Sequence, residues 1–354
     1  MAPGTSKTTR DHMAPGTNNL VVPTPSKTAS CLRDNPFASQ MMHLLRETIS
    51  SYTQDRKLAM ENQKLIRRIG KRGRGRCQFN NPCGICVTKS GDIVIADTDN
   101  HRIQIFTSEG IFKSNFGTRG CKVDQINFPM CVAMTTDGHV ALTDSVNACV
   151  KIFSLQGQLV QVIGDNEIFD IPYGLDISKD GDLAVTDICK HCVTVFRKDG
   201  SVIHGFGEYG SDHYEFDYPY FVCFDKEKHI IVSDSGNSCI KIFSFEGRGL
   251  RTFKQNDFKL MNESFVSLQG MCVDADGNIL VICNSTVYLL ARNGRLWEVL
   301  TSKDGLTNPR CLAFAAPGRL VLTNCDKKHE ICIYKYHYDD YKSVNSVQFY
   351  AINV

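Results

Sequence analysis

The chain has 354 residues, and its 40 Lys and Arg nearly balance 38 Asp and Glu, for a formal net charge of +2. This balance excludes a polycation that binds nucleic acid through net charge alone. No stretch approaches the ~20 consecutive apolar residues of a membrane helix, and the polar, small residues at the start lack the apolar core of a signal peptide. Sixteen cysteines without a signal peptide indicate reduced thiols and a cytoplasmic protein.

The first part of the chain divides into a tail and a helix. Residues 1–34 are polar and of low hydrophobicity, which predicts a disordered tail. The pattern changes at Asn35, a capping residue followed by a proline at the first helical position. Apolar residues then recur at helical spacing as far as Tyr52, so residues 35–63 are expected to form a helix. One interpretation is a short helix that packs on the domain that follows.

Six related copies make up most of the remaining chain. The first contains GDIVIADTDNHRIQIF, and close copies read GHVALTDSVNACVKIF, GDLAVTDICKHCVTVF and HIIVSDSGNSCIKIF; GNILVICNSTVYLL and GRLVLTNCDKKHEICIY are weaker. A strand of mostly small residues precedes each copy, starting at Pro82, Pro129, Pro172, Pro219, Leu268 and Pro309. These starts lie 47, 43, 47, 49 and 41 residues apart. A strand-rich repeat with a period in the forties predicts a β-propeller.

Within each copy the aliphatic residues alternate with a period of two, as at Ile93 and Ile95 and again at Ile103 and Ile105. Buried strands need this period, whereas a helix places apolar residues three and four apart. A fourth strand follows the first five copies but not the sixth. The segment LIRRIG at residues 65–70 resembles the fourth strand LVQVIG of the second copy, so we expect it to close the last blade. The tail SVNSVQFYAINV is the alternative source of that strand.

These motifs identify a resemblance. GDIVIADTDNHRIQIF, with FNNPCGICV ahead of it, resembles an NHL repeat, and six copies resemble the NHL propeller of TRIM-NHL proteins over residues 65 to 336. The fifth copy departs from the pattern at Cys283 and the sixth at Asn324, where the other copies have Asp. The expected fold is all-β: a six-bladed NHL-type propeller closed by an N-terminal strand and preceded by a helix and a disordered tail.

The resemblance also bears on domain organisation. We expect a disordered tail at 1–34, a helix or coiled-coil end at 35–63, the propeller at 64–336 and a tail at 337–354 that is a second candidate for the outer strand. The resemblance implies that residues 35–63 end a coiled coil that forms a homodimer. No Cys/His run has the spacing of a RING finger or B-box, so we expect no ligase chemistry on this chain.

A polar corner separates the strands of each copy, and four of these corners begin with Asp97, Asp144, Asp187 and Asp234. One residue type in one role in four blades predicts structure, namely Asx-type turns in which the carboxylate accepts N–H groups of the next residues. A catalytic site would need a constellation that occurs once. His101 and His191 share a register, which is too few for the convergent ligands of a zinc lyase, so we expect no enzyme.

The cysteines predict neither disulfides nor a metal site. Cys149, Cys192 and Cys239 occupy equivalent positions of successive blades, which places their Cα atoms beyond the ~7 Å that a disulfide spans. The two Cys-x-x-Cys pairs lie in different blades, without a second pair at zinc spacing. We therefore expect no metal and no cofactor.

Two sets of residues are candidates for binding, because the loop before each inner strand and the loop between second and third strands belong to the same face. The first set follows the inner-strand prolines at the channel mouth, and from it we select Tyr173, Tyr220 and Arg310. The second set is basic and comes from blades six, one and two: Arg72, Arg74, Arg76, Arg119, Lys122, Lys327 and Lys328. Acidic and aromatic residues stand opposite, at Asp165, Glu167, Asp170 and the segment 207–220.

This division of charge predicts a non-catalytic platform for a protein partner, because a partner with both charge signs suits it. Resemblance to TRIM-NHL proteins implies substrate recognition for a ubiquitin ligase, or a scaffold. The alternative is single-stranded RNA, with phosphates on the basic half and a base stacked on Tyr173 or Tyr220. No membrane partner is expected.

Overall fold

The computed structural model describes residues 64–254, 267–315 and 318–336. The tail, helix and coiled coil expected before residue 64 and the tail expected after residue 336 lie outside this part of the chain. Within it, no helix has the length and apolar character needed to cross a membrane.

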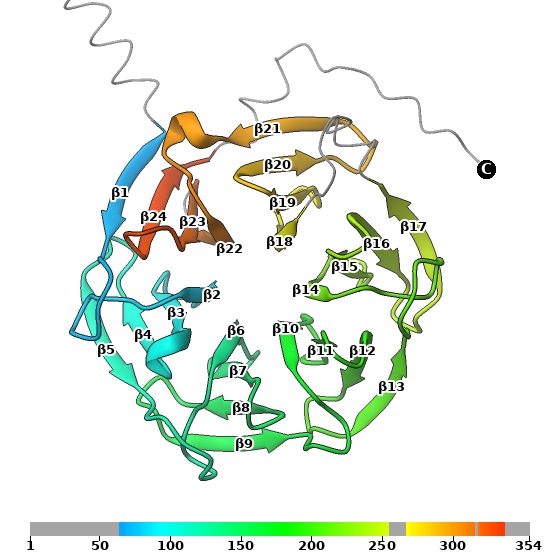
Figure 1. The fold of residues 1–354 in the computed structure, drawn as a ribbon, viewed down its shortest axis with the longest axis horizontal. Coiled ribbons are helices and arrows are strands. Elements are labelled where there is room, and N and C mark those ends of the chain that lie inside the picture. The colour runs from blue at the N-terminus through cyan, green and yellow to red at the C-terminus, as the bar shows by residue number, and fades with distance from the viewer. Residues whose placement is uncertain (1–63, 255–266, 316–317, 337–354) are drawn as a thin grey trace, which may run out of the picture. The chain divides into compact units, whose positions relative to one another are not determined.

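Six four-stranded antiparallel sheets stand around a central axis like the blades of a propeller (Figure 1). Blade 1 contains β2 (Pro82–Val87), β3 (Ile93–Asp97), β4 (Arg102–Phe106) and β5 (Phe112–Phe116). Blade 2 contains β6 (Pro129–Met134), β7 (Val140–Asp144), β8 (Cys149–Phe153) and β9 (Leu159–Ile163). Blade 3 contains β10 (Pro172–Ile177), β11 (Leu183–Asp187), β12 (Cys192–Phe196) and β13 (Val202–Phe206).

The second half of the ring repeats this order. Blade 4 contains β14 (Pro219–Phe224), β15 (Ile230–Asp234), β16 (Cys239–Phe243) and β17 (Gly249–Phe253). Blade 5 contains β18 (Leu268–Val273), β19 (Ile279–Cys283), β20 (Thr286–Leu290) and β21 (Leu296–Leu300). Blade 6 contains β22 (Pro309–Ala315), β23 (Arg319–Asn324), β24 (Glu330–Lys335) and β1 (Leu65–Ile69). Two short 3-10 helices, η2 (Thr98–Asn100) and η4 (Ser302–Asp304), lie in the connections. The predicted six-bladed propeller is confirmed.

The ring closes through β1, which pairs antiparallel with β24 (Figure 1). Ile69 lies opposite Ile331, and its side chain is buried in the core. Arg68 forms an ion pair with the buried carboxylate of Glu330 on the partner strand. The expectation that the start of the propeller region supplies this outer strand is confirmed, and the alternative strand from the C-terminal tail is wrong.

The core follows from the period-two pattern. All five residues of β3, β7, β11 and β15 are buried, as are the aliphatic residues of the third strands except Ile242, which is partly buried. The outer strand β9 alternates between partly buried and exposed positions as far as its last residue, because one of its faces meets solvent. Strands in the middle of a blade therefore pack against both neighbouring blades.

The inner strands follow an alternating pattern around the axis. Blades 1, 3 and 5 have glycine at the third position of the inner strand, at Gly84, Gly174 and Gly270, whereas blades 2, 4 and 6 have a larger residue. A Cβ on Gly84 would lie 2.6 Å from the Cα of Cys131 in the next blade, and one on Gly270 would lie 2.6 Å from the Cα of Cys311. The glycines let neighbouring inner strands approach closely, which narrows the channel at this level.

Candidate functional site

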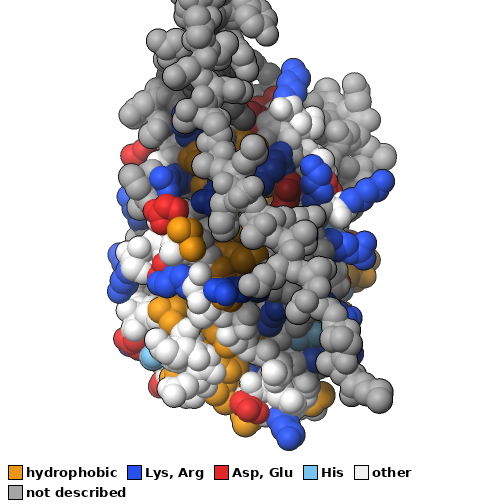
Figure 2. All heavy atoms as spheres, turned by 90° about the vertical axis from the view of Figure 1, so that its left-hand side faces the viewer, with side chains coloured by type: hydrophobic (Ala, Val, Ile, Leu, Met, Phe, Trp, Pro, Cys, Tyr) orange, Lys and Arg blue, Asp and Glu red, His pale blue; other side chains and the backbone are white. Residues whose placement is uncertain are grey.

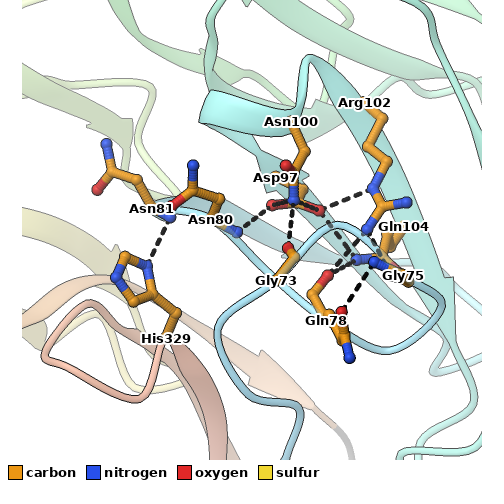
Figure 3. Close-up of polar contacts among 10 residues, drawn as sticks. All are labelled: Gly73, Gly75, Gln78, Asn80, Asn81, Asp97, Asn100, Arg102, Gln104 and His329. Atoms are coloured by element: carbon orange, nitrogen blue, oxygen red, sulfur yellow. Dashed lines mark hydrogen bonds and ion pairs between the residues drawn. The ribbon is translucent and has the colours of Figure 1, made fainter.

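The polar corner of blade 1 is a hydrogen-bond centre around the buried carboxylate of Asp97 (Figure 3). The carboxylate accepts from the backbone N–H of Asn80 at 2.7 Å, from Arg102 Nε at 2.8 Å and from Gln104 Nε2 at 3.0 Å. Asn100 completes the set and also donates to the carbonyl of Gly73 at 2.8 Å. The corner therefore holds the loop that precedes the inner strand.

Equivalent carboxylates hold the same loop in other blades. Asp144 accepts from the N–H of Asn127 at 3.0 Å, and Asp234 accepts from the N–H of Asp217 at 2.7 Å. Each also pairs with a buried lysine at 2.9 Å, Lys151 for Asp144 and Lys241 for Asp234.

The predicted structural role of these aspartates is confirmed, but the predicted partner is right only in blade 3. There Asp187 accepts from the N–H groups of Cys189 and Lys190 in the following turn, at 2.9 Å each. In blades 1, 2 and 4 asparagine, arginine, glutamine or lysine side chains fill the positions around the carboxylate instead. A side chain that reaches in from the third strand leaves no need for an Asx turn.

Histidines at the last corner position link neighbouring blades. Nδ1 of His101 accepts from the N–H of Phe128 at 3.1 Å, Nδ1 of His191 from Tyr218 at 3.3 Å, and Nδ1 of His329 from Asn81 at 2.7 Å (Figure 3). The expectation that only His101 and His191 share a register is wrong, because the longer corner of blade 6 brings His329 to the same place. The three rings join blade to blade rather than converge on one point.

The loops before blades 1, 2 and 4 share one conformation. In each loop a parallel bridge joins its two ends, as between Arg72 and Phe79, between Arg119 and Ile126, and between Tyr209 and Phe216. The residue after the first bridge residue is a glycine in each loop, and its φ is near +155°, a value that favours glycine. These glycines are Gly73, Gly120 and Gly210. Arg72, Arg119 and Tyr209 therefore occupy equivalent, exposed positions on one face. We call this the loop face.

The loop face has a basic sector made by blades 6, 1 and 2. Its members are exposed cations from three neighbouring loops: Arg72, Arg74, Arg119, Lys122, Lys327 and Lys328. The hydrogen bond from Asn81 to His329 joins the loops of blades 1 and 6, and that from Phe128 to His101 joins blades 1 and 2. The structure thus brings these predicted residues together. Figure 2 looks at the rim from the side of β1 and β5, where blue Lys and Arg side chains outnumber red acidic ones.

Within the basic sector a hollow of about 230 Å³ lies between blades 1 and 2. Arg74 and Arg119 line it together with Asp99 and His101. Burial lowers the pKa of His101, and the nearby charge of Arg119 lowers it further. Arg76 is turned elsewhere: its guanidinium lies 4.2 Å from the ring centre of Phe112 on the outer strand. Of the predicted basic residues, Arg76 therefore faces the rim rather than this hollow.

An aromatic sector lies beside the basic one, on blades 3 and 4. Tyr209 is 70% exposed and Tyr218 is 48% exposed, and both rings contact His191 edge-on, with centroids 4.9 and 5.3 Å away. Acidic side chains surround this sector at Asp165, Glu167, Asp170, Glu208 and Asp212, all of them exposed. The sequence predicts an aromatic and acidic segment here, but strand register does not tell which loop side chains reach solvent, so it does not predict the exposure of Tyr209 and Tyr218.

The selected tyrosines lie at the channel mouth. Tyr173 is buried and stacks on Tyr220, with centroids 4.9 Å apart. Burial raises the pKa of Tyr173 well above its ordinary value. Of the residues predicted at the mouth, Tyr173 is therefore buried, whereas Tyr220 and Arg310 are partly exposed. The alternation of the inner strands explains the difference, because the residues before the glycines, Cys83, Tyr173 and Gln269, are the buried ones.

Beyond the mouth, the channel opens into a hollow of about 340 Å³ lined by inner-strand residues. Asp176 lies there, and burial raises its pKa to about 6 although the N–H of Phe224 donates to it at 2.7 Å. Burial also raises the pKa of the thiols of Cys86, Cys223 and Cys272 in this wall well above the ordinary value. These cysteines act as compact, neutral side chains, and none of the described cysteines forms a disulfide.

Comparison with known proteins agrees with this fold. The NHL repeat model matches residues 79–106 and 216–243. Protein brain tumor of Drosophila melanogaster is 38% identical over 85 residues, which are 23% of this chain and 8% of that protein. Tripartite motif-containing protein 2 of Mus musculus is 46% identical over 52 residues, 15% of this chain and 7% of that protein. The alignments thus cover less than a tenth of each relative.

A solved streptogramin B lyase superimposes with a TM-score of 0.54 at 14% identity, over 72% of this chain and 93% of that one. Identity this low shows a common fold and says nothing about activity. The two segments that match the repeat model are the first three strands of blade 1 and of blade 4 with the residues just before them. The chain therefore carries NHL repeats in a six-bladed β-propeller, and its sequence relatives are TRIM-NHL proteins.

Proposed function

We propose that the chain is a non-catalytic recognition platform that binds a protein partner on its loop face. One observation carries the proposal: an exposed basic sector on blades 6, 1 and 2 lies beside an exposed aromatic and acidic sector on blades 3 and 4. Exposed tyrosines supply large contact area at low entropic cost. By resemblance to TRIM-NHL proteins, the partner is a substrate of a ubiquitin ligase or a member of a scaffolded complex.

Charge supports a protein over a nucleic acid. Affinity for nucleic acid comes largely from phosphates neutralised along a basic groove. Here the basic sector gives way to Asp165, Glu167 and Asp170 on blade 3, whose loop repels a strand that continues past blade 2. A protein surface that carries both charge signs complements both sectors at once.

Single-stranded RNA is the second candidate, and the hollow between blades 1 and 2 favours it. Arg74 and Arg119 together offer two guanidinium groups to a phosphate there. A short strand of a few nucleotides fits within the basic sector without meeting the acids of blade 3.

Cross-linking in cells separates the two candidates. Ultraviolet light captures RNA, and an amine- and carboxyl-reactive reagent captures protein. We expect a protein adduct that persists in moderate salt and is lost from Tyr209→Ala/Tyr218→Ala, because that change removes two exposed rings and no charge. An RNA adduct that weakens steeply with salt and disappears in Arg74→Glu/Arg119→Glu, with no protein adduct, would establish the second candidate instead.

A further inference from the structure

Arg310 is a cation at the channel mouth that forms no ion pair with any described residue. It follows Pro309 at the start of β22, the inner strand of blade 6, and is partly buried. Its Nε is fully buried and makes no hydrogen bond, and no carboxylate among the described residues forms an ion pair with it. Arg102 shows the contrast, because its Nε donates to Asp97 at 2.8 Å and its Nη2 to two carbonyls.

The nearest side chains to Arg310 are thiols and a phenol, although the charges of Asp99 and Asp326 also reach Cys325. The positive charge of Arg310 acts on the pKa of three neighbouring groups, Cys83, Tyr173 and Cys325. Burial raises the pKa of all three groups, and Arg310 is among the influences that oppose this rise; for Cys83 the net pKa is about 11. All three are therefore uncharged at neutral pH. Partly burying a cation that has no ion-pair partner is unfavourable unless a group of opposite charge binds to it.

Gln269 provides a second unused group beside Arg310. It holds the same position on β18, the inner strand of blade 5, and is 6% exposed. Its Nε2 donates to Ser267 Oγ at 2.8 Å, while its Oε1 is buried and accepts no hydrogen bond. The two strands approach closely here, since a Cβ on Gly270 would lie 2.9 Å from the carbonyl oxygen of Arg310. An unused donor and an unused acceptor thus belong to equivalent positions of two neighbouring inner strands.

The chemistry of this pair selects a class of ligand. A guanidinium binds a planar carboxylate through two parallel N–H groups, and the geometry of both groups matches. The free Gln269 Oε1 needs a donor, which a peptide N–H near an acidic side chain supplies. A phosphodiester brings no donor for Gln269. The other cations of the loop face stand on the loops and corners of blades 6, 1 and 2, away from the inner-strand positions that form this mouth.

We propose that the channel mouth binds the carboxylate of an Asp or Glu side chain from an extended segment of the protein partner. Arg310 binds the carboxylate, Gln269 accepts from a backbone N–H of the segment, and the stacked Tyr173 and Tyr220 rings form one wall. This inference rests on the proposed function, because it names the chemical group that the partner presents to the platform.

A small-molecule titration tests this site without the partner. The probe is N-acetyl-glutamate methylamide, the readout is the ¹⁵N–¹H signal of Arg310 Nε, and the Nε signal of Arg102 in the same spectrum is the internal control. We expect a saturable shift of the Arg310 signal only. The neutral N-acetyl-glutamine methylamide should cause no such shift, and Arg310→Met should lack the signal and lose binding. Equal shifts with both probes, or a larger shift with dimethyl phosphate, overturn the proposal.

Thermal unfolding supplies an independent readout. Arg310→Met removes an unpaired, partly buried charge and keeps the length of the side chain, so its Tm should rise. Arg102→Met removes the partner of Asp97, so its Tm should fall. A fall for Arg310→Met as large as that for Arg102→Met would mean that Arg310 is bound within the fold, which overturns the proposal. Neither experiment tests whether the loop face binds a protein partner, which the cross-linking of the loop-face variants tests. The Arg310 site and the proposed platform can therefore be disproved separately.

Discussion

At the scale of single residues, the corner aspartates act as anchors between parts of the chain far apart in sequence. Their position was predictable, because one residue type recurs at one place in four copies. Their partners were not, because the N–H group that Asp97 accepts belongs to Asn80, 17 residues earlier. The Asx-turn pattern involves only the residues that directly follow the aspartate, so it cannot predict a partner that precedes it. Only blade 3, where Thr194 replaces the lysine or glutamine of the third strand, returns to the local turn.

The buried pair of Asp144 and Lys151 gives the first prediction. Both side chains are nearly inaccessible, so Asp144→Ala leaves an unpaired ammonium in the core. We expect a loss of about 3–5 kcal/mol in the free energy of unfolding, measured by urea denaturation. The double variant Asp144→Asn/Lys151→Met removes both charges at similar volume and should recover most of the loss. If Asp144→Ala is as stable as the double variant, the ammonium of Lys151 does not need the carboxylate of Asp144, and the prediction is wrong.

The corner histidines give a prediction for pH. Burial lowers the pKa of His101 and His329 below the ordinary 6.5, with further lowering by Arg119 for His101 and by Arg72 for His329, although Asp99 acts in the opposite direction. The unfolded chain therefore binds protons that the folded chain does not, so the free energy of unfolding falls as pH drops below 6.5.

The variant His101→Asn/His329→Asn cannot titrate, and asparagine tolerates the positive φ of both positions. Thermal unfolding from about pH 7.5 to about pH 5.5 should show a flatter dependence than the parent protein. The difference amounts to about 1.4 kcal/mol for each unit by which a histidine pKa is lowered. Parallel curves for variant and parent would contradict this role of the two rings.

At the scale of elements, the strand pattern could be predicted almost completely. Aliphatic residues at every second position predict the second and third strands in all six copies, because strands buried on both faces need such residues. The alternation of the inner strands was missed, although Cys-Gly, Tyr-Gly and Gln-Gly in blades 1, 3 and 5 are its signal. This alternation decides that Tyr173 is buried while Arg310 stays partly exposed, a difference that the period-two pattern alone does not predict.

The closing strand β1 gives a prediction with a control on the same strand. Ile69 is 6% exposed and packs in the core, whereas Ile66 is 43% exposed. We expect Ile69→Ala to cost about 2–5 kcal/mol of unfolding free energy. Ile66→Ala should change it by about 0.5 kcal/mol or less. Equal small effects of both changes, measured by denaturant unfolding, would mean that β1 does not close the ring in solution.

At the scale of the whole molecule, ring closure turns loops that are distant in sequence into one surface. Lys328 and Arg72 are 256 positions apart, yet the hydrogen bond from Asn81 to His329 joins their loops. The basic sector was predictable because blade order follows chain order once the ring is closed. The exposure of Tyr209 and Tyr218 was not, because it depends on how one loop folds back on itself at Gly210.

The most direct test of this account compares equal charge changes on the two faces. Arg74→Glu/Arg119→Glu alters the loop face, and Lys89→Glu/Lys179→Glu alters exposed turns at the opposite ends of the inner strands. Partner capture is measured for both by cross-linking in cells, after unfolding curves establish that both proteins fold. We predict that capture falls at least about tenfold for the loop-face variant, the equivalent of 1.4 kcal/mol, and is unchanged for the other. Loss of capture from the opposite-face variant alone would contradict the account.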